Sequence, residues 1–206
     1  MRITYIHMRR TLLIPALLAA SLLPSTAFAQ AIPPAVDNAP AASDFEADDK
    51  LSSLFEALRR ERDTTKARGI SQEIIAELGE SGSATVDLLM QWATTAIGQK
   101  RNAAALDFLD QATLLQPDFA EAWNRRAGLH YAMGDTRKSM ADIHQVLQRQ
   151  PRHFGAIAGM AAILADRGQD ELALKAWQRY LDIYPADRDA QQAAIKLSEK
   201  LAGSRT

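Results

Sequence analysis

The stretch that decides the fold runs from Trp123 to Pro185 and reads WNRRAGLHYAMGDTRKSMADIHQVLQRQPRHFGAIAGMAAILADRGQDELALKAWQRYLDIYP. Pro151 and Pro185 stand 34 residues apart, and Pro117 precedes Pro151 by the same interval. Thirty-four residues is the length of a helix–turn–helix repeat unit. Proline lacks a backbone N–H and disfavours helix for the residue before it. Each proline is therefore predicted to close the second helix of a repeat.

Alignment of the chain on these prolines gives three rows. They are Val86–Phe119, Ala120–His153 and Phe154–Asp187. Apolar and small residues recur between the rows. The apolar sets are Leu89, Trp123 and Ile157, then Leu109, Ile143 and Trp177, then Ala112, Val146 and Tyr180; the small set is Ala93, Ala127 and Ala161. Because no segment shows the two-residue alternation of a strand, the sequence predicts an all-α fold.

The punctuation inside each row also recurs. Gly134 and Gly168 stand where a residue in the left-handed conformation would end the first helix, and Lys100 holds that place in the first row. Two residues later come Asn102, Thr136 and Asp170, whose side chains are predicted to accept hydrogen bonds from the first N–H groups of the second helix.

These rows resemble the tetratricopeptide repeat (TPR) family, whose pattern is W-x2-L-G-x2-Y, then A-x3-F, then P. The matches are Trp123, Ala127 and Pro151 in the middle row and Ala173, Trp177 and Pro185 in the third. Arg126 replaces the family's leucine and His130 its tyrosine. The resemblance covers about Val86 to Asp187. It implies an α-solenoid of antiparallel helix pairs, a TPR superhelix.

Helices are also predicted on both sides of the three rows. Residues 48–85 read as a diverged N-terminal helix pair, with apolar residues at helical spacing in Leu51–Leu58 and again in Ile70–Leu78. Residues 188–206 read as a capping helix and tail. A stack of repeats needs such a cap with a polar outer face, because each repeat presents an apolar face to its neighbour.

The first residues have the pattern of a signal peptide at residues 1–29. Arg9 and Arg10 precede an apolar run, and the small-residue site Ala27-Phe28-Ala29 follows it. We expect cleavage after Ala29 and a periplasmic or secreted protein of bacterial type. The alternative is an uncleaved anchor, but the run spans about 12 residues where a membrane span needs about 20. Residues 30–47 are rich in alanine and proline and are predicted to be a disordered tether.

Composition excludes several classes of function. The 206 residues carry a net charge of −1 and no cysteine. Removal of residues 1–29 takes away three arginines and no acid, which leaves 21 basic against 25 acidic residues. We therefore expect no binding to nucleic acid, no disulfide, and no membrane span after signal cleavage.

The resemblance implies that the first helix of each pair lines a concave groove that binds another protein or a peptide segment. The predicted groove residues are Asp87, Met90, Thr94, Ile97, Glu121, Asn124, Gly128, Tyr131, Gly155, Ala158, Ala162 and Asp166. The alternative is that the small residues among them only permit tight helix packing. One TPR subclass holds C-terminal carboxylates with paired lysine and asparagine, and this chain lacks that pairing.

No enzyme motif is present in the sequence. The three histidines beyond residue 29 do not have the spacing of a helical zinc pair, and no nucleophile elbow or phosphate-binding loop occurs. We expect no catalytic residue, no cofactor and no metal. The predicted function is a non-enzymatic protein–protein interaction scaffold or adaptor in the cell envelope. The alternative is a self-associating structural subunit of an envelope assembly.

Overall fold

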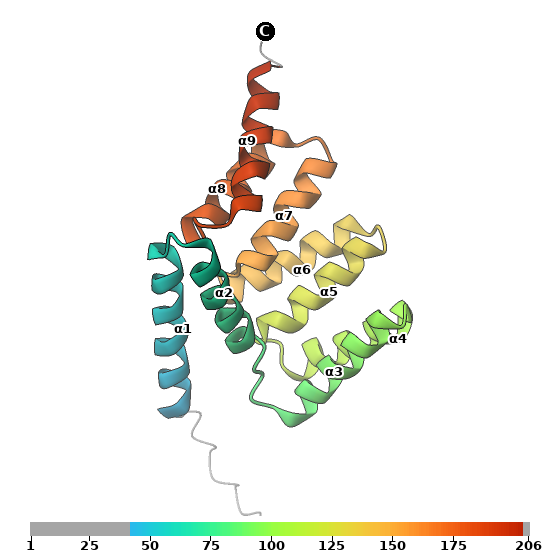
Figure 1. Ribbon diagram of the computed structural model, residues 1–206. Coiled ribbons are helices and arrows are strands. Elements are labelled where there is room, and N and C mark those ends of the chain that lie inside the picture. Colours follow the sequence, from blue (N-terminus) through green and yellow to red (C-terminus); the bar gives the residue numbers. More distant parts are fainter. Residues whose placement is uncertain (1–41, 204–206) are drawn as a thin grey trace, which may run out of the picture. The chain divides into compact units, whose positions relative to one another are not determined.

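The computed structural model describes residues 42–203, and every regular element in that range is a helix (Figure 1). The bounds are α1 Ala42–Arg60, α2 Thr64–Leu78, α3 Ala84–Gly98, α4 Asn102–Leu115, α5 Ala120–Ala132, α6 Thr136–Arg149, α7 Phe154–Asp166, α8 Asp170–Ile183 and α9 Arg188–Gly203. The all-α prediction is confirmed. The predicted signal peptide and residues 30–41 of the predicted tether lie outside the described residues. Helix α1 includes residues 42–47, which were expected to belong to the tether.

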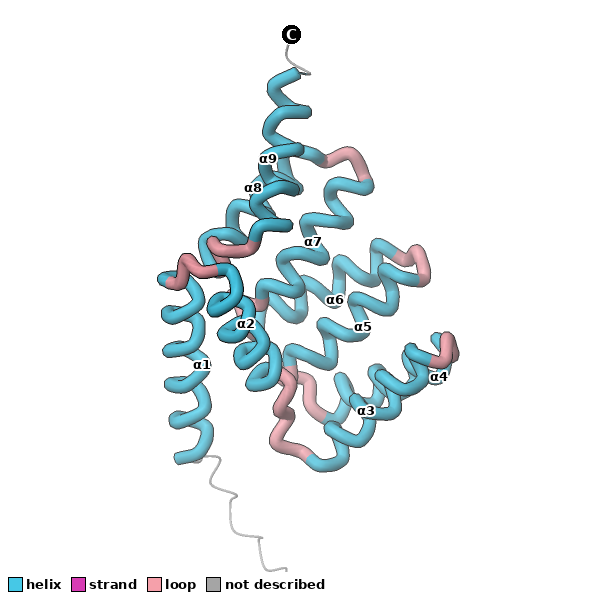
Figure 2. The backbone as a smooth tube through the Cα atoms, in the orientation of Figure 1, coloured by secondary structure: helices cyan, strands magenta, loops and turns pink. Residues whose placement is uncertain are grey.

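Helices α3 to α8 form three antiparallel pairs, α3–α4, α5–α6 and α7–α8, which fall in the three rows of the sequence. The turns within pairs lie at one end of the helices, and the turns between pairs lie at the other end (Figure 2). Gly134 and Gly168 have φ of 81° and 70°. Lys100 adopts the same left-handed conformation, with φ of 58°, although it has a Cβ atom. All three pairs therefore turn in the same way, and the first stores backbone strain.

The caps of the second helices differ from the prediction by one residue. Asn102, Thr136 and Asp170 are the first helical residues rather than caps. Asp135 precedes α6 and its side chain accepts a hydrogen bond from the Lys138 N–H at 3.1 Å. The left-handed glycine ends α5 and leaves Asp135, rather than Thr136, in the non-helical conformation that a cap requires.

Two apolar clusters join consecutive repeats. One is formed by α3 and α4 with Phe119, Ala122 and Leu129 of the second repeat. The other is formed by α5 and α6 with Ala156 and Ile163 of the third. Each repeat thus uses its first helix to cover the repeat before it, as expected for a stack of this kind.

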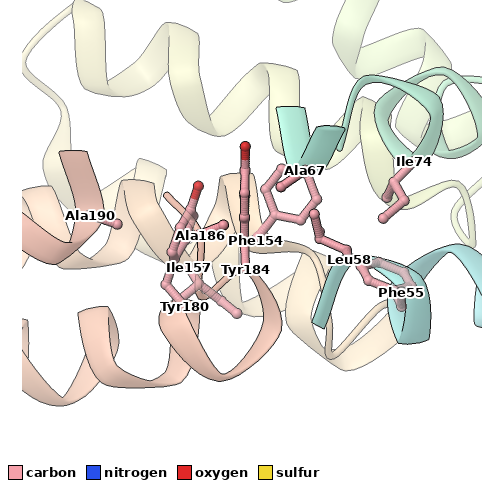
Figure 3. Close-up of a cluster of buried hydrophobic side chains, with 10 residues drawn as sticks. All are labelled: Phe55, Leu58, Ala67, Ile74, Phe154, Ile157, Tyr180, Tyr184, Ala186 and Ala190. Carbon is pink, nitrogen blue, oxygen red and sulfur yellow. The ribbon is translucent and has the colours of Figure 1, made fainter. Parts of the chain in front are cut away.

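The N-terminal pair α1–α2 does not stack on the first repeat, contrary to the expectation of a diverged repeat that opens the stack. Its buried residues Phe55, Leu58, Ala67 and Ile74 share a cluster with α7, α8 and the start of α9 (Figure 3). No member of that cluster comes from α3 or α4. Amphipathic spacing predicts that a helix has an apolar face, but it does not specify which neighbour covers that face. We call α1–α2 the N-terminal hairpin.

Helix α9 lies at the other end of the stack. It packs along α8, and Ala190 is buried against the third repeat. Most of its exposed residues are polar or charged, among them Arg188, Lys196 and Glu199, but Ile195 is 56% exposed as well. Among residues 42–203, no helix is long and apolar enough to cross a membrane.

Candidate protein-binding groove

A hollow of about 280 Å³ lies between α5 and α7. Asn124, Gly128 and Tyr131 of α5 line one side, and Gly155 and Gly159 of α7 line the other. Ser139 and Ile143 of α6 form part of the lining as well. The hollow exists because the first helices of consecutive repeats lie side by side and present small residues to each other. We call it the α5–α7 groove.

The three glycines of the groove have different surroundings. A Cβ atom added to Gly155 would lie 3.3 Å from the His153 ring, and one added to Gly159 would lie 3.5 Å from Cδ1 of Ile143. A Cβ atom added to Gly128 would meet nothing within 4 Å. Tight packing therefore explains the absence of a side chain at Gly155, but it does not explain Gly128. A glycine inside a helix costs about 1 kcal/mol relative to alanine.

One end of the groove is spanned by a hydrogen bond. The Tyr131 hydroxyl donates to Oδ2 of Asp166 at 2.6 Å, which joins α5 to α7. The hydrogen bond to the carboxylate raises the pKa of Tyr131, so the phenol stays protonated at neutral pH. Asp166 remains exposed. This end of the groove therefore presents an acidic rim.

The other end is a polar cluster around Glu121. Its carboxylate accepts from Nδ2 of Asn124 at 2.9 Å and from Nε of Arg125 at 3.0 Å. Nε2 of His153 lies 3.2 Å from Oε2 of Glu121, while Nδ1 accepts the Ala156 N–H at 3.1 Å. Because Nδ1 accepts, the neutral ring carries its proton on Nε2 and donates it to Glu121. His153 therefore caps α7 and ties it to α5.

The pKa of Glu121 reflects this environment. Burial acts to raise the pKa of the carboxyl, but the hydrogen bonds from His153 and Arg125, with the positive charge of Arg125, outweigh burial and lower the pKa below its ordinary value. The side chain is thus ionised at neutral pH and fully engaged by its neighbours. Arg125 also donates to the Thr94 hydroxyl of α3, so the cluster extends to the first repeat.

The structure brings together only some of the predicted groove residues. Asn124, Gly128, Tyr131 and Gly155 line the α5–α7 groove, and Glu121 and Asp166 lie at its ends. Met90 is buried in the core of the first repeat, so it is not open to a partner. The other five are placed as follows: Asp87 accepts from the Ser81 hydroxyl, Thr94 binds Arg125, Ile97 is exposed, Ala158 packs beside the N-terminal hairpin cluster, and Ala162 is half-buried.

Seven residues that line the groove were not among those predicted: Arg125, Ala127, Ser139, Ile143, Ala156, Gly159 and Ile163. Arg125 is the charged one. Its position four residues after Glu121 is the spacing of an ion pair on one helix face, and that signal could have found it. In the described part of the chain, no group of three or more histidine, aspartate or glutamate side chains is placed to hold a metal ion.

A second polar cluster contains Arg126 and His130, the two residues that depart from the family pattern. Arg126 binds Asp142 through two hydrogen bonds of 2.9 and 2.7 Å and reaches Asp110 of α4 at 2.7 Å. His130 lies 3.8 Å from the same Asp142. The hydrogen bonds that Arg126 donates to Asp142 raise the pKa of Arg126 against the effect of partial burial. A charge network thus replaces the apolar contact of leucine and tyrosine between the first and second repeats.

Comparison with known proteins agrees with this architecture. A TPR repeat-containing protein of Rhizobium etli is 62% identical over 157 residues, which cover 76% of this chain and 77% of that protein. The chain belongs to the TPR family. No protein-family model matches it. Members of this family are in general non-enzymatic modules of protein–protein interaction.

Solved structures of TPR domains share the fold. The first TPR of Spaghetti (RPAP3), bound to an HSP90 peptide, superimposes with a TM-score of 0.55 at 18% identity, over 58% of this TPR protein and 95% of that chain. The Sgt2 TPR domain of Aspergillus fumigatus gives 0.55 at 17%, over 60% and 83%. The MamA protein gives 0.52 at 15%, over 75% and 82%. These similarities concern the fold alone.

Proposed function

We propose that this TPR protein is an exported adaptor that binds a segment of a partner protein in the α5–α7 groove. The observation that carries the proposal is Gly128. This glycine lies in the middle of α5, it is exposed, and no neighbouring atom would touch an added Cβ. A helix that keeps a destabilising residue without a packing reason is expected to keep it for the space it leaves.

The lining of the groove indicates the chemistry of the segment. Ile143 and Ile163 form the buried apolar floor of the groove, and Asn124 and Arg125 supply hydrogen-bond donors at one end. Asp166 supplies a carboxylate at the other end. A helix or extended segment with a small apolar side chain at Gly128 and a basic residue near Asp166 would match the apolar floor, the donors at one end and the carboxylate at the other. The solved neighbour named for its HSP90 peptide offers a precedent for a peptide on this fold.

The C-terminal carboxylate of a chaperone is not the ligand we propose. The places of the paired lysine and asparagine hold Met90 and Thr94 in the first repeat, Asn124 and Gly128 in the second, and Ala158 and Ala162 in the third. None of these pairs offers a lysine. The partner segment is therefore expected to bind through its side chains rather than through its terminus.

Export is the second part of the proposal, and it rests on the signal-peptide pattern of residues 1–29. Fractionation of cells that make the full chain, followed by N-terminal sequencing, tests it. We expect Gln30 as the first residue of a periplasmic or secreted product. Retention of residues 1–29 in a cytoplasmic product would contradict export while leaving the groove untouched.

Substitution of Gly128 tests the groove. Gly128→Glu places a charged side chain in the groove and should abolish capture of the partner from envelope extracts. Gly69→Glu is a matched control, because Gly69 also lies inside a helix with nothing within 4 Å of an added Cβ, but on α2. Equal capture by both variants would contradict the proposal.

A further inference from the structure

A second hollow, of about 430 Å³, lies between the N-terminal hairpin and the turn that joins α8 to α9. Arg68 and Ile75 line it from α2, and Tyr184 and Arg188 line it from the turn and the start of α9. Its volume falls in the range of small-molecule sites, about 300 to 1,000 Å³. It shares no lining residue with the α5–α7 groove. We call it the hairpin pocket.

The hairpin pocket contains a buried tyrosine hydroxyl without a partner. Tyr184 is only 6% exposed, and its ring stacks on that of Tyr180 with centroids 6.0 Å apart. Figure 3 shows both hydroxyl groups pointing the same way, and the Tyr180 hydroxyl donates to Oδ2 of Asp187, a lining residue, at 2.7 Å. The Tyr184 hydroxyl makes no hydrogen bond within residues 42–203. Buried tyrosine hydroxyls usually have a partner, so this one is available to a bound molecule.

Two arginines of the pocket are free as well. Arg68 and Arg188 are both exposed, and neither forms an ion pair or a side-chain hydrogen bond in the described part of the chain. Arg68 belongs to the hairpin, and Arg188 belongs to the other side of the pocket. A guanidinium group offers paired N–H donors that match the geometry of a carboxylate. Cationic donors therefore lie on both sides of the pocket.

Two aspartates also line the pocket, but only one of them is free. The Asp187 carboxylate accepts the Tyr180 hydroxyl and two N–H groups at the start of α9. Asp189 is exposed and forms no ion pair with a described residue. The free groups are thus two guanidinium groups, one carboxylate and one hydroxyl. Their net charge is positive by one.

We propose that the hairpin pocket binds a small monocarboxylate with an apolar body. The carboxylate of the ligand accepts hydrogen bonds from the guanidinium groups of Arg68 and Arg188 and from the Tyr184 hydroxyl. One negative charge balances the free groups, whereas a phosphate monoester carries close to two. Ile75 is 53% exposed although it is apolar, and it supplies surface for the body of the ligand.

A ligand in this position joins two parts of the fold. It contacts the N-terminal hairpin through Arg68 and the end of the third repeat through Tyr184. The unfolded chain lacks the pocket, so binding should also raise the stability of the protein. This inference does not depend on the proposed function, because the pocket and the α5–α7 groove have no residue in common.

Isothermal titration calorimetry of the purified chain tests the pocket, with phenylacetate and hexanoate as probes. At least one of these acids should bind about tenfold more tightly than acetate, which lacks the apolar body. Phenylacetamide and hexanamide have the same bodies without the charge and should bind about tenfold more weakly than the acids. Absence of binding by both acids, equal binding of the amides, or tighter binding of phenyl phosphate would overturn the inference.

Substitutions test whether the acid binds in the hairpin pocket. Tyr184→Phe removes only the unpartnered hydroxyl, so it should weaken binding about fivefold without lowering the Tm of the free protein. Arg68→Gln should weaken binding about tenfold. Arg59→Gln is the matched control, because Arg59 is also exposed on a helix of the hairpin and forms no ion pair with a described residue. Unchanged affinity in either pocket variant, or an equal loss in Arg59→Gln, would show that the acid does not bind there.

Discussion

Phe55 and Phe154 pack edge to face, with ring centroids 6.5 Å apart and planes at 78°. One ring belongs to α1 and the other begins α7, so this contact joins the N-terminal hairpin to the third repeat. Arg152 also lies over the Phe55 ring, with its guanidinium carbon 4.4 Å from the centroid of that ring. The hairpin thus braces the turn that leads into α7, the helix that forms one wall of the α5–α7 groove.

A double-mutant cycle tests this placement of the hairpin. Phe55→Leu and Phe154→Leu should each destabilise the fold, and their effects should couple by about 1 kcal/mol because the ring–ring contact is lost in either variant. Urea unfolding of the four proteins measures the coupling. The control pair is Phe55→Leu with Phe108→Leu, which should be additive. Coupling in the control pair instead would mean that the hairpin packs on the first repeat.

Replacement of Lys100 by glycine should stabilise the protein. Its φ of 58° costs an ordinary residue about 1 kcal/mol, whereas glycine adopts it freely. Lys100→Gly should therefore raise the free energy of unfolding by up to about 1 kcal/mol. Gln99→Gly, at φ of −89°, removes a side chain without relieving strain and should not stabilise the protein. Thermal unfolding distinguishes the two variants, and a lower Tm for Lys100→Gly would contradict the strain.

Removal of one partner of the Arg126–Asp142 ion pair should destabilise the fold more than removal of both partners together. Asp142→Leu leaves the guanidinium of a mostly buried arginine without its principal partner and should destabilise by about 3 kcal/mol. The double variant Arg126→Leu with Asp142→Leu restores an apolar contact at the family's leucine position and should recover most of that loss. Chemical denaturation measures both. A double variant less stable than either single one would show that the ionic network is required.

Stability should fall in acid as Glu121 is protonated. The native pKa of Glu121 lies below its ordinary value of 4.5, so its contribution to folding is complete above that pH and is lost as pH falls through the native pKa. The stability difference between wild type and Glu121→Gln should be largest near neutral pH and shrink below pH 4.5. Urea unfolding at several pH values measures it. Glu56→Gln, in an exposed pair with Arg60, should show a small difference throughout.

The repeat architecture was predictable because it is periodic. Pro117, Pro151 and Pro185 fix where each second helix ends, and Gly134 and Gly168 fix where each first helix ends. Local backbone preferences act over a few residues, so they can be read from a single sequence. The caps were misplaced by one residue because Asp135 and Thr136 are both capable of capping, and the adjacent turn decides between them.

Contacts between distant segments were not predictable in the same way. The spacing of apolar residues predicts an apolar face with Phe55, Leu58 and Ile74. That face could cover the first repeat as well as the side of the third repeat. Met90 was placed in the groove from its position in the repeat, whereas it is buried in the apolar cluster that joins the first and second repeats. Arg125 and His153 acquire their roles only because the fold brings both to Glu121.

The central claim is that a partner segment lies against Gly128. A photoreactive amino acid placed at Gly128 reports this directly, with the same substitution at Gly69 as the control. In cells that make the full chain, we predict one defined crosslinked product from the Gly128 position, absent from Gly69 and lost when Asn124→Arg is added to fill the groove. Products that are the same at both positions, or that persist with Asn124→Arg, would contradict the account.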